Sequence, residues 1–169
     1  LTAVEKGWFV SSALIGCIAG VACSGYLSDR FGRKKLLFVA ALLFLLSAIG
    51  CALFASFSSV VAARLTGGIG IGVASVLVPL YISEISPAAV RGRLVTCYQL
   101  AITVGILIAY ITNAMVLNAA QKADAPAAFE LADLLFRREA WRGMFSIGFL
   151  PSLLFLIGLF FVPESPRWL

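Results

Sequence analysis

The stretch that decides the fold is residues 7–35, GWFVSSALIGCIAGVACSGYLSDRFGRKK. Residues 7–27 carry no charged side chain, and a helix of that length crosses roughly 30 Å of hydrocarbon at about 1.5 Å per residue. A short polar turn follows at once, and its basic residues are Arg30, Arg33, Lys34 and Lys35. An uncharged run that ends in a compact basic turn predicts a membrane-spanning helix whose turn lies at one membrane face.

Further runs of the chain have the same length and character. The predicted helices cover residues 7–27, 36–57, 58–83, 94–118 and 143–162, and a long loop covers residues 119–142. Strands of a β-barrel would form short segments of alternating polarity, whereas these runs are long and continuous. The sequence therefore predicts an all-α polytopic membrane protein, with residues 1–169 forming one partial transmembrane domain.

Composition excludes several classes of function. The chain has 62% hydrophobic and 12% charged residues, against about a quarter charged in soluble domains. It has no His, so triads and zinc sites that need imidazole are excluded, and we expect neither a metal, a cofactor nor an enzyme. The cysteines lie inside apolar runs and are expected to behave as small buried residues; they are Cys17, Cys23, Cys51 and Cys97.

The basic residues predict an orientation. They are dense in the turn before residue 36 and in the turn between residues 84 and 93, and they recur after residue 162. Alternation of the helices puts these segments on one side, which the positive-inside rule makes the cytoplasm of a multi-pass cell-membrane protein. The net charge of +5 then fits loops beside anionic headgroups, and no nucleic-acid partner is expected. The chain starts at Leu1 without a leader, which favours an internal piece of a longer protein.

The predicted helices differ in their small residues. One small residue recurs every four positions in the first helix, as Ser12, Gly16, Gly20, Ser24 and Ser28, and such a stripe allows another helix to approach closely. Residues 36–57 carry Leu, Phe, Ala and Val on every face, with Ser47, Gly50 and Cys51 as the least apolar positions, so this helix is expected to face lipid. Residues 58–83 contain a glycine cluster at 67–72 and Pro79, which bends a helix.

Polar side chains follow one face of the fourth predicted helix. This face carries Gln99, Thr103, Ile106, Tyr110 and Asn113. Most of these side chains form hydrogen bonds and none is charged, which suits a neutral polyhydroxylated ligand. The alternative is that Gln99 and Thr103 bond across helices, worth roughly 1 kcal/mol or less each.

Arg64 is the one charge deep inside a predicted span. It lies about six residues, or roughly 9 Å, from the outer end of its helix, where an unpaired charge costs about 3 kcal/mol. Either its long side chain reaches the outer headgroups, or a polar partner sits on a helix outside this chain.

Spaced motifs resemble a known family. Residues 25–34, GYLSDRFGRK, are similar to the loop signature between the second and third helices of the major facilitator superfamily. Others resemble the sugar porter family within it: PLYISE at 79–84, RGR at 91–93, Gln99, WR at 141–142 and PESPR at 163–167. The resemblance covers nearly the whole chain and makes the predicted helices the second to sixth of twelve, without the first helix and the second half.

The resemblance implies a function and a substrate wall. Sugar porters move a neutral monosaccharide by alternating access, either coupled to protons, which is the expectation for this chain, or by facilitated diffusion, which is the alternative. The residues that match the family's sugar-contacting wall are Gln99, Ile102, Thr103 and Ile106. Arg64 resembles the fourth-helix arginine that faces an aspartate of the first helix in proton-coupled members.

The resemblance also implies a cytoplasmic gate. Its expected residues are Gly25, Asp29, Arg30, Arg33, Glu84, Arg91, Glu164 and Arg167. Gly25 is expected to allow close helix approach, and Asp29 to accept hydrogen bonds from Arg33 or a facing helix N-terminus. Glu84 with Arg91 and Glu164 with Arg167 are expected to add acid–base sets.

Two other functions remain open at this point. A cyclitol or quinate carrier would use the same architecture, and a membrane sugar sensor would bind its ligand without moving it. The expected partners of the chain are thus a monosaccharide, protons, the lipid bilayer and the missing part of the same transporter.

Overall fold

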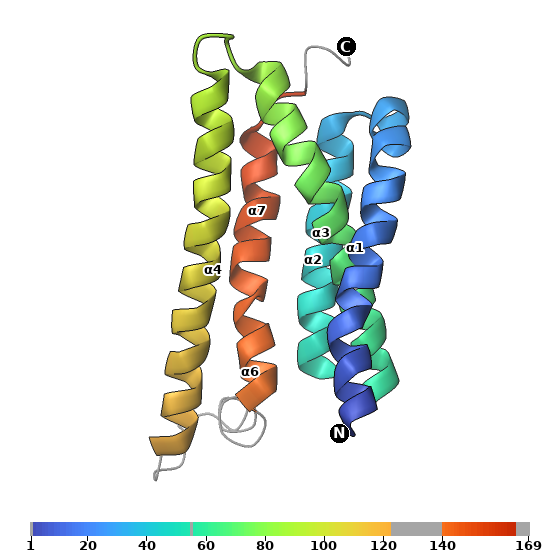
Figure 1. Cartoon of the computed structure of the whole chain (residues 1–169), viewed down its shortest axis with the longest axis vertical. Helices are drawn as coiled ribbons and strands as arrows, with labels where there is room; N and C mark the ends of the chain where they lie inside the picture. The colour runs from blue at the N-terminus through green and yellow to red at the C-terminus, as the bar shows by residue number, and fades with distance from the viewer. Residues whose placement is uncertain (1, 55, 123–139, 165–169) are drawn as a thin grey trace.

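The computed structural model describes residues 2–54, 56–122 and 140–164. The helices are α1 (Ala3–Phe31), α2 (Arg33–Leu53), α3 (Phe57–Ile85), α4 (Arg91–Lys122), α6 (Ala140–Ile147) and α7 (Phe149–Phe161) (Figure 1). They contain five segments that are long and apolar enough to cross a membrane, the last of them running through α6 and α7. The described residues form no strand, as predicted for an all-α protein.

The helices extend beyond the uncharged runs. Helix α1 begins at a capping box, in which the Thr2 backbone N–H donates to Glu5 Oε2 at 2.7 Å and the Glu5 N–H donates to Thr2 Oγ1 at 3.3 Å. The same bonds, first the one from the Thr2 backbone, hold the pKa of Glu5 below its ordinary value. Counting uncharged residues measures the hydrocarbon crossing, whereas a helix continues into the headgroup region until a cap or turn stops it.

The last predicted helix, residues 143–162, is two helices. Helix α6 ends at Ile147, and α7 begins at Phe149 after the Gly148 turn. Pro151 explains the break, because it has no N–H to donate to the Ile147 carbonyl one turn earlier. The Gly148 N–H instead bonds the Phe145 carbonyl at 3.0 Å.

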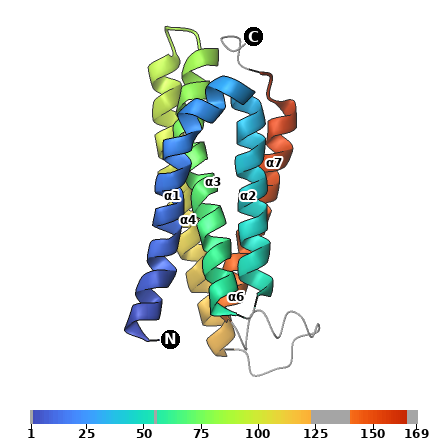
Figure 2. The same cartoon turned by 90° about the vertical axis from the view of Figure 1, so that its right-hand side faces the viewer.

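Helix α3 is the centre of the bundle (Figure 2), and at its glycines it lies backbone to backbone against α1. A Cβ at Gly68 or Gly72 would overlap the backbone of α1 at Ala13 and Cys17. The contact is reciprocal, because a Cβ at Gly16 or Gly20 of α1 would overlap the carbonyl groups of α3. Glycine is required on both helices for this approach.

The predicted small-residue stripe of α1 is confirmed as this interface. All of its members are buried: Ser12, Gly16, Gly20, Ser24 and Ser28. The Ser12 and Ser24 hydroxyls donate to carbonyls of their own helix, those of Phe9 and Val21. Ser12 and Ser24 therefore bury no unsatisfied hydroxyl at this contact, whereas the Ser28 hydroxyl has no hydrogen-bond partner among the described residues.

Helix α2 packs on the other glycine face of α3. Gly67 faces Ser47, and Gly70 faces Ala40 and Phe44. The main core joins α2, α3 and α7 through Leu36, Leu37, Ala40, Ala41, Val73, Leu77, Tyr81 and Leu159. The expectation that residues 36–57 face lipid is wrong for this face, because a helix that is apolar all round does not reveal in its own sequence which side its partner covers.

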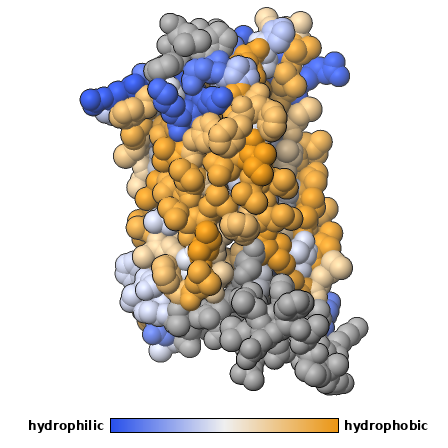
Figure 3. Space-filling model, turned by 180° about the vertical axis from the view of Figure 1, so that it is seen from behind, coloured by the Kyte–Doolittle hydropathy of each residue, from blue (hydrophilic) through white to orange (hydrophobic). Residues whose placement is uncertain are grey.

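Apolar side chains cover the middle of the molecule and hydrophilic ones gather at one end (Figure 3). Helix α4 contributes much of this surface, since only 6% of the residues in its most apolar stretch are buried in the described structure. It contacts α3 and α6. An apolar band with polar ends is the surface of a protein that spans a bilayer.

The substitution Gly68→Val tests the backbone contact between α1 and α3. We expect it to destabilise the full-length protein that contains this chain by about 1–3 kcal/mol, because the new side chain forces the helices apart. The measurement is the melting temperature in detergent. Gly158→Val is the matched control, since a Cβ at Gly158 meets nothing within 4 Å. Equal melting temperatures for the two variants would contradict the contact.

Candidate functional site

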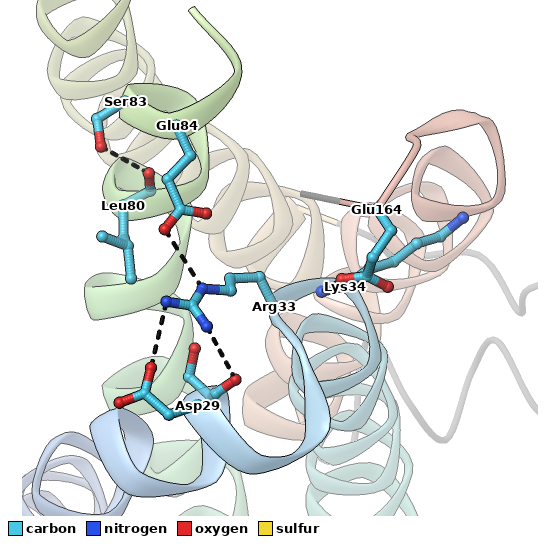
Figure 4. A network of polar contacts seen from close by, with 8 residues as sticks. Asp29, Arg33, Lys34, Leu80, Ser83, Glu84 and Glu164 are labelled. Carbon is cyan, nitrogen blue, oxygen red and sulfur yellow. Dashed lines mark hydrogen bonds and ion pairs between the residues drawn. The ribbon is translucent and has the colours of Figure 1, made fainter. Parts of the chain in front are cut away.

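Arg33 ties three helices together at the hydrophilic end of the bundle (Figure 4). It is the first residue of α2, and its Nη2 lies 3.2 Å from Asp29 Oδ1 of α1. Its Nε lies 3.4 Å from Glu84 Oε1 of α3, and its Nη1 donates to the Ser28 carbonyl at 3.2 Å. We call Asp29, Arg33 and Glu84 the Arg33 cluster.

Gly32 places Arg33 where it can reach back to α1. It is both the last cap of α1 and the first cap of α2, with φ 92° and ψ 154°. That φ is the only positive one among the described residues and is strained for any residue with a Cβ. The turn is therefore tight enough for one arginine to bridge the end of α1 and the neighbouring α3.

The two carboxylates of the Arg33 cluster differ in exposure. The Glu84 side chain is 4% exposed, the Arg33 side chain 14%, and the Asp29 side chain 77%. Solvent screens an exposed ion pair and a buried charge depends on its partner, so the contact with Glu84 carries more of the coupling between helices.

Glu164, which is distant in the sequence, caps the N-terminus of α2. No side chain next to the N-terminus of α2 caps it. Its first turn is Arg33, Lys34 and Lys35, and their positive charges are unfavourable at the positive end of a helix dipole. The Lys34 backbone N–H donates to Glu164 Oε1 at 3.1 Å, although the two residues are far apart in the chain. A carboxylate at this point satisfies an orphan donor and offsets the dipole.

Tyr81 fixes the segment that carries Glu164. Its hydroxyl donates to the Pro163 carbonyl at 2.6 Å, and its side chain is 6% exposed inside the main core. Tyr81 belongs to the quoted motif at 79–84, but the sequence analysis gave it no role. A tyrosine in an apolar helix one turn before a buried glutamate is a signal that could have found it, because a buried phenol needs a partner.

The other expected gate residues stand as follows. Arg30 is exposed and lies over the Phe31 ring, and Arg91 has a buried Nε without a hydrogen bond to any described residue. The structure pairs Glu84 with Arg33, a partner that the sequence analysis did not name for it. Arg167 lies outside the described residues. A Cβ at Gly25 meets nothing within 4 Å, so the close approach expected there is made to no described residue, and the expectation stays a prediction.

Arg64 has partners inside the chain. Its Nε donates to the Phe9 carbonyl of α1 at 2.9 Å, and its guanidinium lies 4.3 Å from the Phe9 ring centroid and 5.4 Å from that of Phe145. Neither open alternative named this arrangement. A backbone carbonyl and two ring faces hold the half-buried charge, and ring faces attract cations most strongly where water is scarce.

Arg64 also borders a cavity of about 230 Å³ among α1, α2, α3 and the α6–α7 pair. Its polar lining comes from Arg64, Ser47, Cys51 and Ser152. No set of three or more Cys, Asp or Glu that could hold a metal ion occurs in residues 2–54, 56–122 and 140–164.

The predicted sugar wall is split by the structure. Gln99 and Ile102 line a hollow of about 610 Å³ between α4 and α3, whose other lining residues are Ser75, Pro79, Val95, Thr96 and Tyr98. Thr103 and Ile106 are exposed on α4 and do not line this hollow. The Thr103 hydroxyl donates to the Gln99 backbone carbonyl at 3.2 Å. Ser75 and Tyr98 are residues that the sequence analysis missed.

Comparison with known proteins identifies the family. The chain belongs to the sugar (and other) transporter family, whose model matches residues 2–169. It is 43% identical over its whole length to the arabinose-proton symporter of Bacillus subtilis, covering 34% of that protein. It is 42% identical to the D-xylose-proton symporter of Escherichia coli K12, with 96% of this chain and 35% of that protein covered. The chain thus spans about a third of the length of its curated relatives.

Solved structures have the same fold. The Escherichia coli xylose transporter XylE in its inward open conformation matches with a TM-score of 0.83 and 41% identity, over 99% of this chain and 41% of that one. The proton:xylose symporter XylE bound to 6-bromo-6-deoxy-D-glucose matches with a TM-score of 0.83 and 40% identity, over 99% and 38%. These matches confirm the predicted sugar porter family and major facilitator fold, and the chain is a multi-pass cell-membrane protein of a transporter family.

Glu84→Gln tests the weight of the buried ion pair. We expect it to lower the stability of the full-length protein by about 3 kcal/mol, because it leaves the Arg33 charge short of its most buried partner. Asp29→Asn is the matched control and should cost under about 1 kcal/mol, since that carboxylate is exposed. Melting temperatures in detergent measure both, and a larger loss for Asp29→Asn would overturn this ranking.

Glu164→Ala tests the cap on α2. Loss of a helix cap costs about 1 kcal/mol, so amide hydrogen exchange in the turn around Lys34 should become about fivefold faster. Glu5→Ala removes a carboxylate that caps a different helix, α1, and should leave exchange at Lys34 unchanged. Unchanged exchange at Lys34 in Glu164→Ala would show that the carboxylate does not cap α2.

Proposed function

We propose that this chain is the N-terminal half, without its first helix, of a transporter that moves a neutral monosaccharide across the membrane by alternating access. The family membership supports transport, and the names of the relatives point to sugars. Because the chain spans about a third of those relatives, the transport cycle belongs to the whole protein.

The hollow at Gln99 carries this proposal. Its lining is uncharged, and the Gln99 side-chain amide makes no hydrogen bond to the described residues. An amide both donates and accepts, so it suits a hydroxyl, which does the same. Thr103 and Ile106 extend the polar face along α4 and are proposed to complete the wall when the remaining helices are present.

Proton coupling is proposed to act through Arg64. The names of the arabinose, xylose and galactose relatives include a proton. The Nε of Arg64 is held by the Phe9 carbonyl, while its side chain borders the 230 Å³ cavity. An acid that approached from the first helix would bind this arginine when ionised and release it when protonated, which couples the proton to the conformational change.

The Arg33 cluster and Glu164 are proposed to belong to the cytoplasmic gate, together with Gly25, Arg30, Arg91 and Arg167. The geometry supports two roles within this set: some residues hold the helices together, and others are exposed charges. Glu84, Tyr81 and Glu164 fasten α2, α3 and the segment after α7 to one another, while the Asp29 side chain, paired with Arg33, is 77% exposed and Arg30 is also exposed. Exposed charges are the ones able to meet the opposite half of a closing transporter.

Counterflow of sugar tests the proposed function. The full-length protein is reconstituted into sealed liposomes, and exchange of labelled glucose, xylose and galactose is followed for wild type, Gln99→Ala and the control Leu100→Ala. Leu100 is 61% exposed and does not line the hollow. We expect saturable exchange of at least one sugar, reduced at least tenfold in Gln99→Ala, which corresponds to about 1.4 kcal/mol, and unchanged in Leu100→Ala.

The other outcomes separate the alternatives. Sugar binding without exchange by folded wild-type protein would favour a sensor. Neither binding nor exchange would contradict a monosaccharide carrier and direct the search to cyclitols. Wild-type exchange that is unaffected by Gln99→Ala would leave a sugar carrier whose site is not on this face of α4.

A further inference from the structure

We propose that the hollow between α3 and α4 is a sugar subsite in which the Tyr98 ring packs against the sugar and Ser75 bonds one of its hydroxyls. This inference rests on the proposed function and adds two residues, one from each helix, to the site at Gln99. Neither residue belongs to the polar face predicted from the sequence of α4 alone.

The two helices bring Ser75 and Gln99 to the same depth in the membrane. Helices α3 and α4 run in opposite directions, and the loop between them lies at the end of the bundle that holds the Arg33 cluster (Figures 1 and 4). Gln99 lies about eight residues into α4, or roughly 12 Å from its start at Arg91. Ser75 lies about nine residues before Glu84, or roughly 13.5 Å from it. A ligand that contacts Gln99 therefore lies level with Ser75.

The lining has the chemistry of a sugar site. A pyranose has an apolar face of C–H groups and a rim of hydroxyls. The hollow offers the half-buried Tyr98 ring with Pro79 and Ile102 as apolar surface, and the hydroxyls and amide of Ser75, Thr96 and Gln99 as polar groups. Its volume of about 610 Å³ lies within the roughly 300–1,000 Å³ of small-molecule sites.

Pro79 removes the usual helical donor for the Ser75 carbonyl. A proline has no N–H, so Pro79 does not donate the helical bond that the Ser75 carbonyl, one turn earlier, would otherwise accept. In a membrane a freed carbonyl needs another donor. The Ser75 hydroxyl donates to the Gly72 carbonyl at 2.9 Å and keeps its own lone pairs. Ser75 lines the hollow, and its hydroxyl is thus able to accept a hydrogen bond from a ligand there.

The remaining polar groups are also available. The Tyr98 hydroxyl makes no hydrogen bond to the described residues, and the Thr96 hydroxyl donates to the Gly92 carbonyl, which leaves it free to accept. Ser75 on α3 and Thr96 on α4 thus offer acceptors, and Tyr98 and Gln99 on α4 offer groups able to donate. A polyhydroxylated ligand satisfies both sets at once.

The test measures sugar affinity and maximal exchange rate separately in the full-length transporter. Wild type, Tyr98→Ala, Tyr98→Phe, Ser75→Ala and the control Leu100→Ala are compared by counterflow with the sugar that wild type exchanges best. We expect Tyr98→Ala to raise KM about tenfold and Ser75→Ala about fivefold, with maximal rates within about twofold of wild type. Tyr98→Phe, which keeps the ring, should stay within about threefold of wild type in KM.

Each other outcome overturns the subsite. Unchanged KM in Tyr98→Ala and Ser75→Ala, with wild-type exchange intact and Gln99→Ala impaired, would refute it while leaving the proposed function standing. Equal loss in Tyr98→Ala and Tyr98→Phe would refute packing on the ring. If Tyr98→Ala does not fold, as judged by size-exclusion chromatography, Ser75→Ala decides. No exchange by wild type would end both this inference and the proposed function.

Discussion

The structure depends on one contact, the backbone of α1 lying directly on the backbone of α3. Gly16 and Gly20 on one helix and Gly68 and Gly72 on the other leave no room for a Cβ between them. Because α3 offers a second glycine face to α2, it becomes the axis around which the other helices pack. In a bilayer, where apolar side chains gain little by leaving lipid for one another, such close approach is the main source of helix association.

That contact also determines what lies at the hydrophilic end. With α1, α2 and α3 fixed side by side, the turn at Gly32 carries Arg33 to a buried Glu84, and the segment after α7 reaches the open N-terminus of α2 through Glu164. Helix α4 is different, because among the described helices it contacts mainly α3 and α6, is mostly exposed, and borders the hollow at Gln99. Helices α1, α2 and α3 and the segment after α7 thus hold one another in place. The proposed sugar-binding wall on α4 is the part that further helices complete.

Repeating patterns in the sequence predicted the membrane spans and the α1 interface. Contacts made by backbone N–H and C=O groups could not be predicted, because every residue carries these groups. Uncharged runs predicted the spans, and the spacing of Ser12 to Ser28 predicted the α1 interface. Arg64 was recognised as costly, but its partner is the Phe9 carbonyl, which every residue possesses and no motif reveals. The same holds for the Lys34 N–H that Glu164 caps. Residues 36–57 were assigned to lipid because their uniform composition hides the face that the glycines of α3 select. Ser75 and Tyr98 need two helices to be seen as one site.

The most direct test of the account is an experimental structure of the full-length protein with its sugar bound. We expect the sugar within hydrogen-bonding distance of the Gln99 amide, beside Tyr98 and Ser75, and an α1–α3 contact in which Gly16 and Gly68 still lie backbone to backbone. A sugar bound away from α4, with Gln99 turned toward lipid, would contradict the site. Side chains or lipid between α1 and α3 would contradict the constraint on which the rest of the fold depends.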